Sequence, residues 1–136
     1  MAEPLLDVLA RYRRAMLDLD ADALAELYAP DGVHEFPFRF PRFPARYEGR
    51  EAIRAGYRAA WSATPARPTE IEETAVHRST DPEVLVVEQQ VRGEIAGGHG
   101  EFAIAGLLVI RVRGGLIVHA RDYMDGLAAS GGLTGR

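Results

Sequence analysis

The chain has 136 residues, a formal net charge of −4 and a hydrophobic fraction of 47%. This length fits one domain with a buried core, and the composition excludes disordered and collagen-like chains. Cysteine is absent, which excludes disulfides and cysteine metal ligands, and lysine is absent, which excludes Schiff-base chemistry through this chain. The mildly acidic balance and the scattered arginines argue against a nucleic-acid partner.

No apolar run approaches the roughly 18 residues that a membrane-spanning helix needs, and the first residues lack the pattern of a signal peptide. We therefore expect no membrane partner and take a cytoplasmic location as the default. The four histidines, at positions 34, 77, 99 and 119, lack the close spacing of metal ligands, so we expect no metal site.

The first half of the chain has the pattern of three helices. Apolar residues recur at spacings of three and four in a first segment that begins at Pro4. Asp20 is suited to cap a short second helix, and a third helix is expected from Arg50 to about Ser62. The side chains expected to face inward are Leu5, Leu9, Tyr12, Met16, Leu19, Leu24, Leu27, Tyr28, Ile53, Tyr57 and Trp61.

Alternating patterns predict strands elsewhere. A first strand is expected over Val33–Phe38, after a turn at Ala29–Gly32. The segment Phe36–Phe43 holds four of the five phenylalanines and is expected to form a loop, either a lid over a ligand or a dimer contact, with the lid favoured. Later strands are expected over Ile71–Arg78, Val84–Glu94, Glu101–Val112 and Leu116–Met124, with turn clusters between them.

Three helices followed by a run of antiparallel strands predict the α+β class. A curved antiparallel sheet wrapped around the three N-terminal helices would form a cone with an internal pocket for a small molecule. We expect residues 1–136 to form this single domain, with the glycine-rich residues 126–136 as a loose tail.

Asp122 is the polar exception on an apolar strand face. Alternation places it on one side of the last strand with Leu116, Val118, Ala120 and Met124. A carboxyl group in such surroundings tends to have a raised pKa, as a general acid or base near pH 7 requires. The alternative is a structural carboxylate that is bonded to backbone amides or to an arginine.

Other polar side chains are expected on inward faces. His34 shares its strand face with two phenylalanines, and Gln89 shares its face with leucine and valines. Tyr12 and Tyr57 lie on the inward stripes of their helices. Each of these residues alone is more often an ordinary core residue, so the prediction of a site depends on their convergence with Asp122.

The helical half of the chain resembles SnoaL-like and ketosteroid-isomerase-like proteins of the nuclear transport factor 2-like superfamily. The segments that carry the resemblance are Ala10–Tyr12, Asp18–Leu24, Leu27–Asp31, Glu48–Ile53 and Tyr57-Arg58. The resemblance extends over nearly the whole chain and implies an α+β cone with an apolar pocket, assembled as a homodimer. By position, Tyr12 matches the isomerase tyrosine that donates to the substrate oxygen, and Tyr28 and Tyr57 match supporting tyrosines.

Two positions depart from the ketosteroid isomerases. Phe36 stands where that family has its catalytic base. Leu108 stands where the family has a protonated aspartic acid that completes the oxyanion hole. We therefore do not expect ketosteroid isomerisation.

The last strand resembles other branches of the superfamily. Arg121-Asp-Tyr-Met-Asp125 is similar to the Arg-Asp-Tyr-Phe-Asp ending of limonene epoxide hydrolases, in which the residue matching Asp122 activates water. The arginine and aspartate that those enzymes carry on a central strand correspond to Gln89 and Val91 here. The phenazine-biosynthesis A/B proteins also resemble the C-terminal half, and Gly56 takes the place of their catalytic histidine.

The leading prediction is a cofactor-independent enzyme of SnoaL-like type that transfers protons on an apolar, oxygenated small molecule. Isomerisation, cyclisation, dehydration or hydrolysis would each need one proton shuttle and one donor that polarises an oxygen. The catalytic candidates are Asp122 as acid or base, Tyr12 as oxygen donor and His34 as an orienting group. The candidates to bind the substrate are Tyr57, Gln89, Phe36, Phe38, Trp61, Met124 and Leu108.

Two other functions are compatible with the sequence. One is a non-catalytic ligand-binding or dimerisation domain, in which Asp122 is ionised and paired. The other is an epoxide hydrolase with a rearranged triad that uses Glu35 or Glu88 for the missing groups. That arrangement requires Glu35 to face inward, against the expected strand phase.

Overall fold

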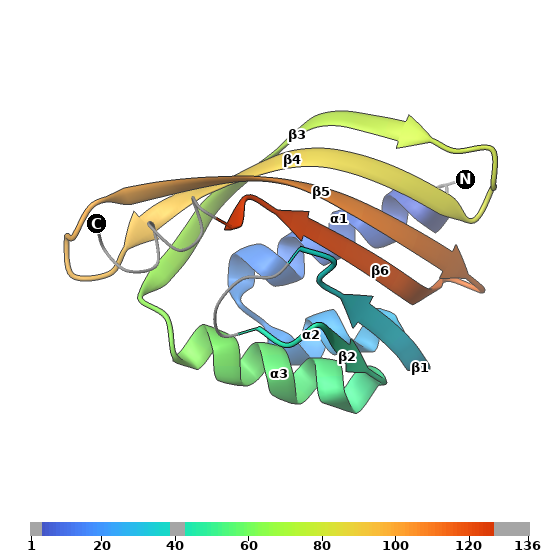
Figure 1. Ribbon diagram of the computed structural model, residues 1–136, viewed down its shortest axis with the longest axis horizontal. Coiled ribbons are helices and arrows are strands. Elements are labelled where there is room, and N and C mark those ends of the chain that lie inside the picture. Colours follow the sequence, from blue (N-terminus) through green and yellow to red (C-terminus); the bar gives the residue numbers. More distant parts are fainter. Residues whose placement is uncertain (1–3, 39–42, 127–136) are drawn as a thin grey trace.

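Three helices lie against one face of a curved six-stranded sheet in the computed structural model, which describes residues 4–38 and 43–126 (Figure 1). The predicted α+β class and its cone-like arrangement are confirmed. The elements are α1 (Pro4–Asp18), α2 (Ala21–Glu26), β1 (Tyr28–Glu35), β2 (Arg46–Glu48), α3 (Arg50–Ser62), β3 (Ala66–Arg78), β4 (Val84–Ile95), β5 (Glu101–Arg113) and β6 (Leu116–Met124). Residues 39–42 of the predicted lid and residues 127–136 of the predicted tail lie outside the described residues.

The strands are ordered β2-β1-β6-β5-β4-β3 across the sheet. The pairs β3–β4, β4–β5 and β5–β6 are antiparallel, as predicted. Strand β1 pairs antiparallel with β2 but parallel with β6, so the sheet is mixed rather than purely antiparallel. This order places β6 between β1 and β5 and brings residues 88 positions apart into contact.

Strand β1 differs from the sequence prediction at both ends. It begins at Tyr28 and includes the residues that were predicted to form a turn. Its pairing with β6 shifts between Tyr28, which faces Ile117, and Val33, which faces His119, so the intervening residues form an irregular bulge. The short strand β2 was not predicted, because its three residues lie in a segment that proline and aromatic residues mark as a loop.

A second irregularity changes which side of β6 faces the helices. Arg111 pairs with His119 and Val112 pairs with Ile117, which leaves Val118 without a partner in the ladder. The strand phase reverses at this bulge, so Ile117 is fully buried while Leu116 and Val118 are only half-buried. The prediction that Leu116 and Val118 face inward is therefore wrong, whereas Ala120 and Asp122 are buried as expected.

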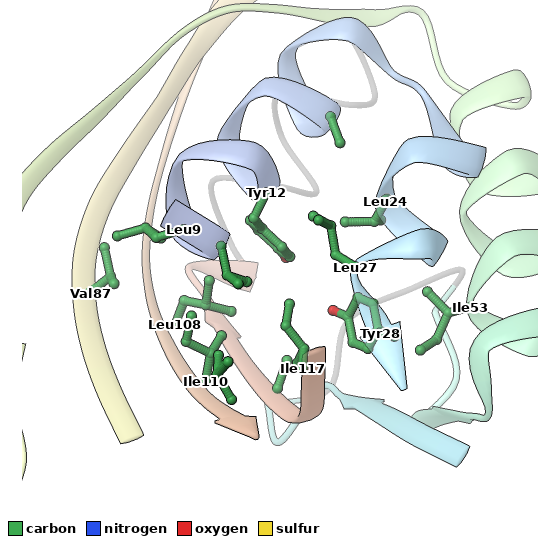
Figure 2. Packing of buried hydrophobic residues seen from close by; sticks show 14 of the residues in the cluster. Leu9, Tyr12, Leu24, Leu27, Tyr28, Ile53, Val87, Leu108, Ile110 and Ile117 are labelled. Atoms are coloured by element: carbon green, nitrogen blue, oxygen red, sulfur yellow. The ribbon is translucent and has the colours of Figure 1, made fainter. Parts of the chain in front are cut away.

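The core fills the space between the helices and the sheet. Figure 2 shows Tyr12 from α1 and Tyr28 from β1 pointing toward Leu108, Ile110 and Ile117 of the sheet. Each of these side chains is at most 3% exposed. Burial of one such leucine or isoleucine side chain contributes about 1.5–3 kcal/mol, so this packing stabilises the helices against the sheet.

Arginines of α3 attach this helix to its neighbours. The Arg54 guanidinium donates hydrogen bonds to the carboxylates of Asp22 and Glu26 on α2 and of Glu51 on α3. Arg50 donates from Nε and Nη2 to the backbone oxygen of Tyr28, at 2.9 and 2.6 Å. These contacts set the position of α3 over the sheet and so determine where its inward-facing side chains reach.

Two cavities stand out among the described residues, and neither lies between the helices and the sheet. An open cleft of about 510 Å³ lies where the α1–α2 corner meets the end of α3, and Trp61 lines it. A groove of about 130 Å³ lies on the outer face of the sheet beside Arg111 and Arg121. None of the described helices is both long enough and apolar enough to cross a membrane.

Candidate functional site

A cluster of hydrogen-bonded polar side chains surrounds His34 in the interior. The Tyr28 hydroxyl lies 2.6 Å from Nδ1 of His34. The other ring nitrogen, Nε2, lies 2.9 Å from the Tyr57 hydroxyl and 3.2 Å from Oδ2 of Asp122. Among residues 4–38 and 43–126, His34 lies within hydrogen-bond distance of all three groups, and Tyr12 joins the cluster through hydrogen bonds with Tyr28 and Tyr57.

The sheet register brings His34 and Asp122 together. His34 on β1 is the parallel partner of Ala120 on β6, and Asp122 is the next residue on the same face of β6. Leu108 on β5 is the direct partner of Asp122 and forms an apolar wall beside the carboxylate. Tyr57 reaches the histidine from α3, with its ring edge-on at a centroid distance of 5.3 Å.

The burial of these groups is close to complete. His34 is 0% exposed and Asp122 is 7% exposed. A polar group is expensive to bury unless it is hydrogen-bonded, and here each buried group has at least one partner. The cluster therefore satisfies itself inside an apolar core.

Three tyrosine hydroxyls near Asp122 remain protonated far above neutral pH. Burial raises the pKa of Tyr12, Tyr28 and Tyr57 well above the usual 10, and the nearby Asp122 carboxylate raises each of them further. At neutral pH all three are therefore hydrogen-bond donors. Such donors suit a substrate oxygen that gains negative charge.

The two carboxylate oxygens of Asp122 have different surroundings. Oδ2 is held by His34. Oδ1 makes no hydrogen bond to any of residues 4–38 or 43–126, and it is not among the fully buried polar atoms that lack a partner. One oxygen therefore orients the group, and the other is available to a ligand.

Most of the predicted site residues lie around this cluster. Tyr12, Tyr57, Phe36 and Leu108 are all at most 3% exposed, and the Phe36 ring lies 4.8 Å from the His34 ring. Trp61 and Met124 are half-buried and pack against the edge of the core. Trp61 also contacts Tyr57, at a centroid distance of 5.0 Å.

Two predicted residues lie apart from the site. Phe38 is 60% exposed and packs against Tyr123, so the prediction that it faces inward is wrong. The reason is that β1 ends at Glu35, beyond which strand alternation no longer applies. Gln89 is half-buried on β4 opposite Gly106, two strands away from β6, and the structure does not bring it to Asp122.

Tyr28 belongs to the site although it was predicted only as a core and supporting residue. The sequence predicted a turn at Ala29–Gly32, so Tyr28 was placed before the first strand. In the structure Tyr28 is the first residue of β1 and contacts His34, six positions later. The resemblance to supporting tyrosines of isomerases was the available signal for this residue. Because the sheet register was unknown, this resemblance did not identify His34 as the partner of Tyr28.

The residues of the rearranged epoxide-hydrolase triad are not brought together. Glu35 lies on the opposite face of β1 from His34 and pairs with His119 at 3.0 Å. Glu88 is exposed and pairs with His77. Within the described ranges, no group of three histidine, aspartate or glutamate side chains is arranged to hold a metal ion.

Gly56 also has a clear structural role. A Cβ atom at this position would overlap the ring of Tyr47, which packs directly on the helix backbone. Position 56, which the resemblance to the phenazine-biosynthesis A/B proteins matched to a histidine, therefore has no space for a larger side chain.

Solved structures of the same fold include both isomerase-like and hydrolase proteins. A proposed isomerase of Bacillus subtilis has a TM-score of 0.86 and 26% identity, covering 98% of this chain and 94% of that chain. A protein of Catenulispora acidiphila with a ketosteroid isomerase-like fold, in complex with trimethylamine, has a TM-score of 0.72 and 25% identity, covering 94% of both chains. An LEH-like epoxide hydrolase of Mycobacterium tuberculosis, at 18% identity, shares the fold with a TM-score of 0.69, covering 96% and 90% of the two chains.

The sequence comparison agrees with the fold. An uncharacterised PhzA/B-like protein of Pseudomonas aeruginosa is 30% identical over 121 residues, which is 89% of this chain and 84% of the relative. The predicted resemblance to this superfamily is therefore confirmed. The SnoaL-like domain family matches residues 9–120, which include the whole His34 cluster except Asp122. The chain belongs to the SnoaL-like domain family.

Proposed function

We propose that the protein is a cofactor-independent enzyme that transfers protons on an apolar, oxygenated small molecule. The observation that carries the proposal is that the two carboxylate oxygens of the buried Asp122 differ. His34 holds Oδ2 by a hydrogen bond, whereas Oδ1 makes no hydrogen bond to the described residues and is available to a ligand. A carboxylate that is fixed by one oxygen and surrounded by hydroxyl donors has what proton transfer beside a carbonyl, hydroxyl or epoxide oxygen needs. Isomerisation, cyclisation, dehydration and hydrolysis all belong to this chemistry.

The proposed roles follow from the positions of the side chains. Asp122 exchanges a proton with the substrate through Oδ1. Tyr12 and Tyr57 donate hydrogen bonds to the substrate oxygen, because both hydroxyls stay protonated beside the carboxylate. His34 holds Oδ2 of Asp122 through Nε2, so we assign it the role of a positioning residue.

The substrate would reach Asp122 from the end of the molecule where α1, α3 and β6 finish together (Figure 1). Half-buried apolar side chains lie near these ends, namely Met16, Trp61 and Met124. Apolar side chains beside the entrance favour an apolar ligand, which agrees with the predicted substrate class. A homodimer is also part of the proposal, because half-buried apolar residues (Val86, Leu107 and Val109) lie on the outer face of the sheet.

The proposal is tested by hydrogen exchange at carbon. Cyclic enones and polyketide-like ketones are incubated with the enzyme in D₂O, and deuterium at the carbon next to the carbonyl group is measured by NMR; epoxides are screened for hydrolysis in parallel. We expect Asp122→Asn to lower kcat of the best substrate by about 10²-fold or more, because the amide cannot accept the proton.

The control is Asp7→Asn, which makes the same chemical change at an exposed position of α1. It should retain full turnover and thermal stability. Turnover that survives in Asp122→Asn would contradict the proposal, provided that circular dichroism shows both variants to be folded.

One observation favours a ligand-binding domain as the second candidate. The interior around Asp122 is filled by core side chains, and the carboxylate already has a partner in His34. A binding domain would retain one of the test compounds in equilibrium dialysis and return it unchanged. The deuterium experiment separates this case from the enzyme.

A further inference from the structure

Three hydrogen-bonding groups compete for the two ring nitrogens of His34. Nδ1 has a single partner, the Tyr28 hydroxyl at 2.6 Å. Nε2 has two partners, the Tyr57 hydroxyl at 2.9 Å and the Asp122 carboxylate at 3.2 Å. A neutral imidazole offers one N–H donor and one lone pair, so the position of its proton decides which contacts are attractive.

A proton on Nε2 makes every contact favourable. Tyr28, which stays protonated because burial holds its pKa well above 10, then donates to the lone pair of Nδ1. The Nε2–H group points at two acceptors, the hydroxyl oxygen of Tyr57 and Oδ2 of an ionised Asp122. No pair of acceptors is left facing each other.

The other two proton arrangements fit the geometry less well. With the proton on Nδ1, the lone pair of Nε2 would face an ionised carboxylate at 3.2 Å with no hydrogen between them. A doubly protonated ring would form a charge-assisted pair with Asp122, for which about 2.7–2.9 Å is typical. The 3.2 Å separation from Asp122 is longer, whereas the 2.6 Å contact with Tyr28 fits an O–H donor.

From this geometry we infer that Tyr28 is a positioning residue: it holds His34 in the Nε2–H tautomer, so that the Nε2–H group donates to Oδ2 of Asp122 and orients this carboxylate as the base. The inference builds on the proposed function and decides the direction of the first proton transfer, from the substrate carbon to Oδ1 of Asp122. In the same tautomer, the Nε2–H group of His34 also donates a hydrogen bond to the Tyr57 hydroxyl oxygen. Tyr57 then keeps its own proton to donate, and the Tyr12 hydroxyl is one acceptor within its reach.

The groups around the ring come from four elements. They are Tyr12 on α1, Tyr28 on β1, Tyr57 on α3 and Asp122 on β6. Asp122 is the single carboxylate of this set, and the other three are hydroxyl donors. The Phe36 ring, 4.8 Å from His34, adds an apolar surface.

The tautomer can be measured directly. A variant in which His77, His99 and His119 are changed to glutamine leaves His34 as the single histidine. Its ring nitrogens, labelled with ¹⁵N, are observed in a two-bond ¹H–¹⁵N correlation spectrum, which distinguishes protonated from unprotonated nitrogen. We expect protonated Nε2 and unprotonated Nδ1 at neutral pH.

Tyr28→Phe removes the donor to Nδ1 and keeps the ring. In this variant the Nδ1–H form should become populated, kcat for deuterium exchange should fall, and its pH profile should shift while KM changes little. Tyr47→Phe is the matched control, because Tyr47 is half-buried and its hydroxyl makes no hydrogen bond to His34. It should keep the wild-type tautomer.

A protonated Nδ1 in the otherwise unaltered site, alone or together with protonated Nε2, would overturn the inference. This outcome needs no further variant, so failure of Tyr28→Phe to fold does not affect the test. If the Nε2–H tautomer is found but Asp122→Asn still turns over substrate, the proposed function fails and the tautomer assignment stands.

Discussion

At the scale of single residues, His34 is the side chain on which the polar interior depends. It is fully buried, and it supplies the partner for two tyrosine hydroxyls and for the Asp122 carboxylate. A buried polar group that loses its partner costs more than the hydrogen bond itself contributed, because it remains out of water. The stability of the fold and the orientation of the candidate base therefore rest on the same imidazole ring.

We expect His34→Phe to lower the free energy of unfolding by about 3 kcal/mol, because three buried polar groups lose their shared partner. The measurement is urea denaturation followed by circular dichroism. The control is His77→Phe, which removes an exposed histidine–glutamate pair and should change stability by less than about 0.5 kcal/mol. Equal stabilities of the two variants would show that the buried cluster contributes nothing.

At the scale of elements, Gly56 determines how α3 meets β2. Glycine in the middle of a helix costs roughly 1 kcal/mol relative to alanine, so its presence needs a reason. Here the ring of Tyr47 on β2 packs against the bare backbone of α3 at Gly56. The Tyr47 ring also contacts Phe36 and Tyr57, so this packing supports the site from behind.

Gly56→Ala should destabilise the protein by about 1–3 kcal/mol, because overpacking outweighs the gain in helix propensity. In a Tyr47→Ala background the same substitution should stabilise by about 1 kcal/mol, since only the propensity term remains. Urea denaturation of the four members of this double-mutant cycle tests both signs. A stabilising Gly56→Ala in the native background would mean that the ring moves aside without cost.

At the scale of the whole molecule, composition and burial together determine the response to alkaline pH. The chain has no lysine and no cysteine, so tyrosine is the side chain that titrates between about pH 8 and pH 12. Burial raises the pKa of Tyr12, Tyr28 and Tyr57 in the folded state above the unfolded value near 10. The folded state then binds more protons than the unfolded state, and stability falls as pH rises.

We expect the free energy of unfolding to be insensitive to these three groups below about pH 9. Above about pH 10 it should fall by up to about 4 kcal/mol per pH unit, one proton for each tyrosine. Urea denaturation across this range gives the slope, and tyrosinate absorbance reports the titration. A native protein in which all five tyrosines ionise before unfolding would contradict the burial of the cluster.

Local patterns were sufficient to predict several elements. The bounds of α3 (Arg50–Ser62) and of β6 (Leu116–Met124) agree with the sequence prediction, and Asp20 caps α2 through a hydrogen bond from the Ala23 amide. These features depend on residues within one or two turns of each other. Strand alternation likewise identified the inward position of Asp122, because Ala120 and Asp122 follow the bulge in regular phase.

The sequence by itself determined the α+β class, the three helices and the inward acid, because helical periodicity, capping and strand alternation act over a few residues. Only the tertiary structure decided that β1 lies parallel to β6, that bulges shift both strands and that Tyr28 meets His34. These outcomes depend on the register between segments far apart in the chain. No local pattern encodes that register, because it is set when all the apolar faces are buried together.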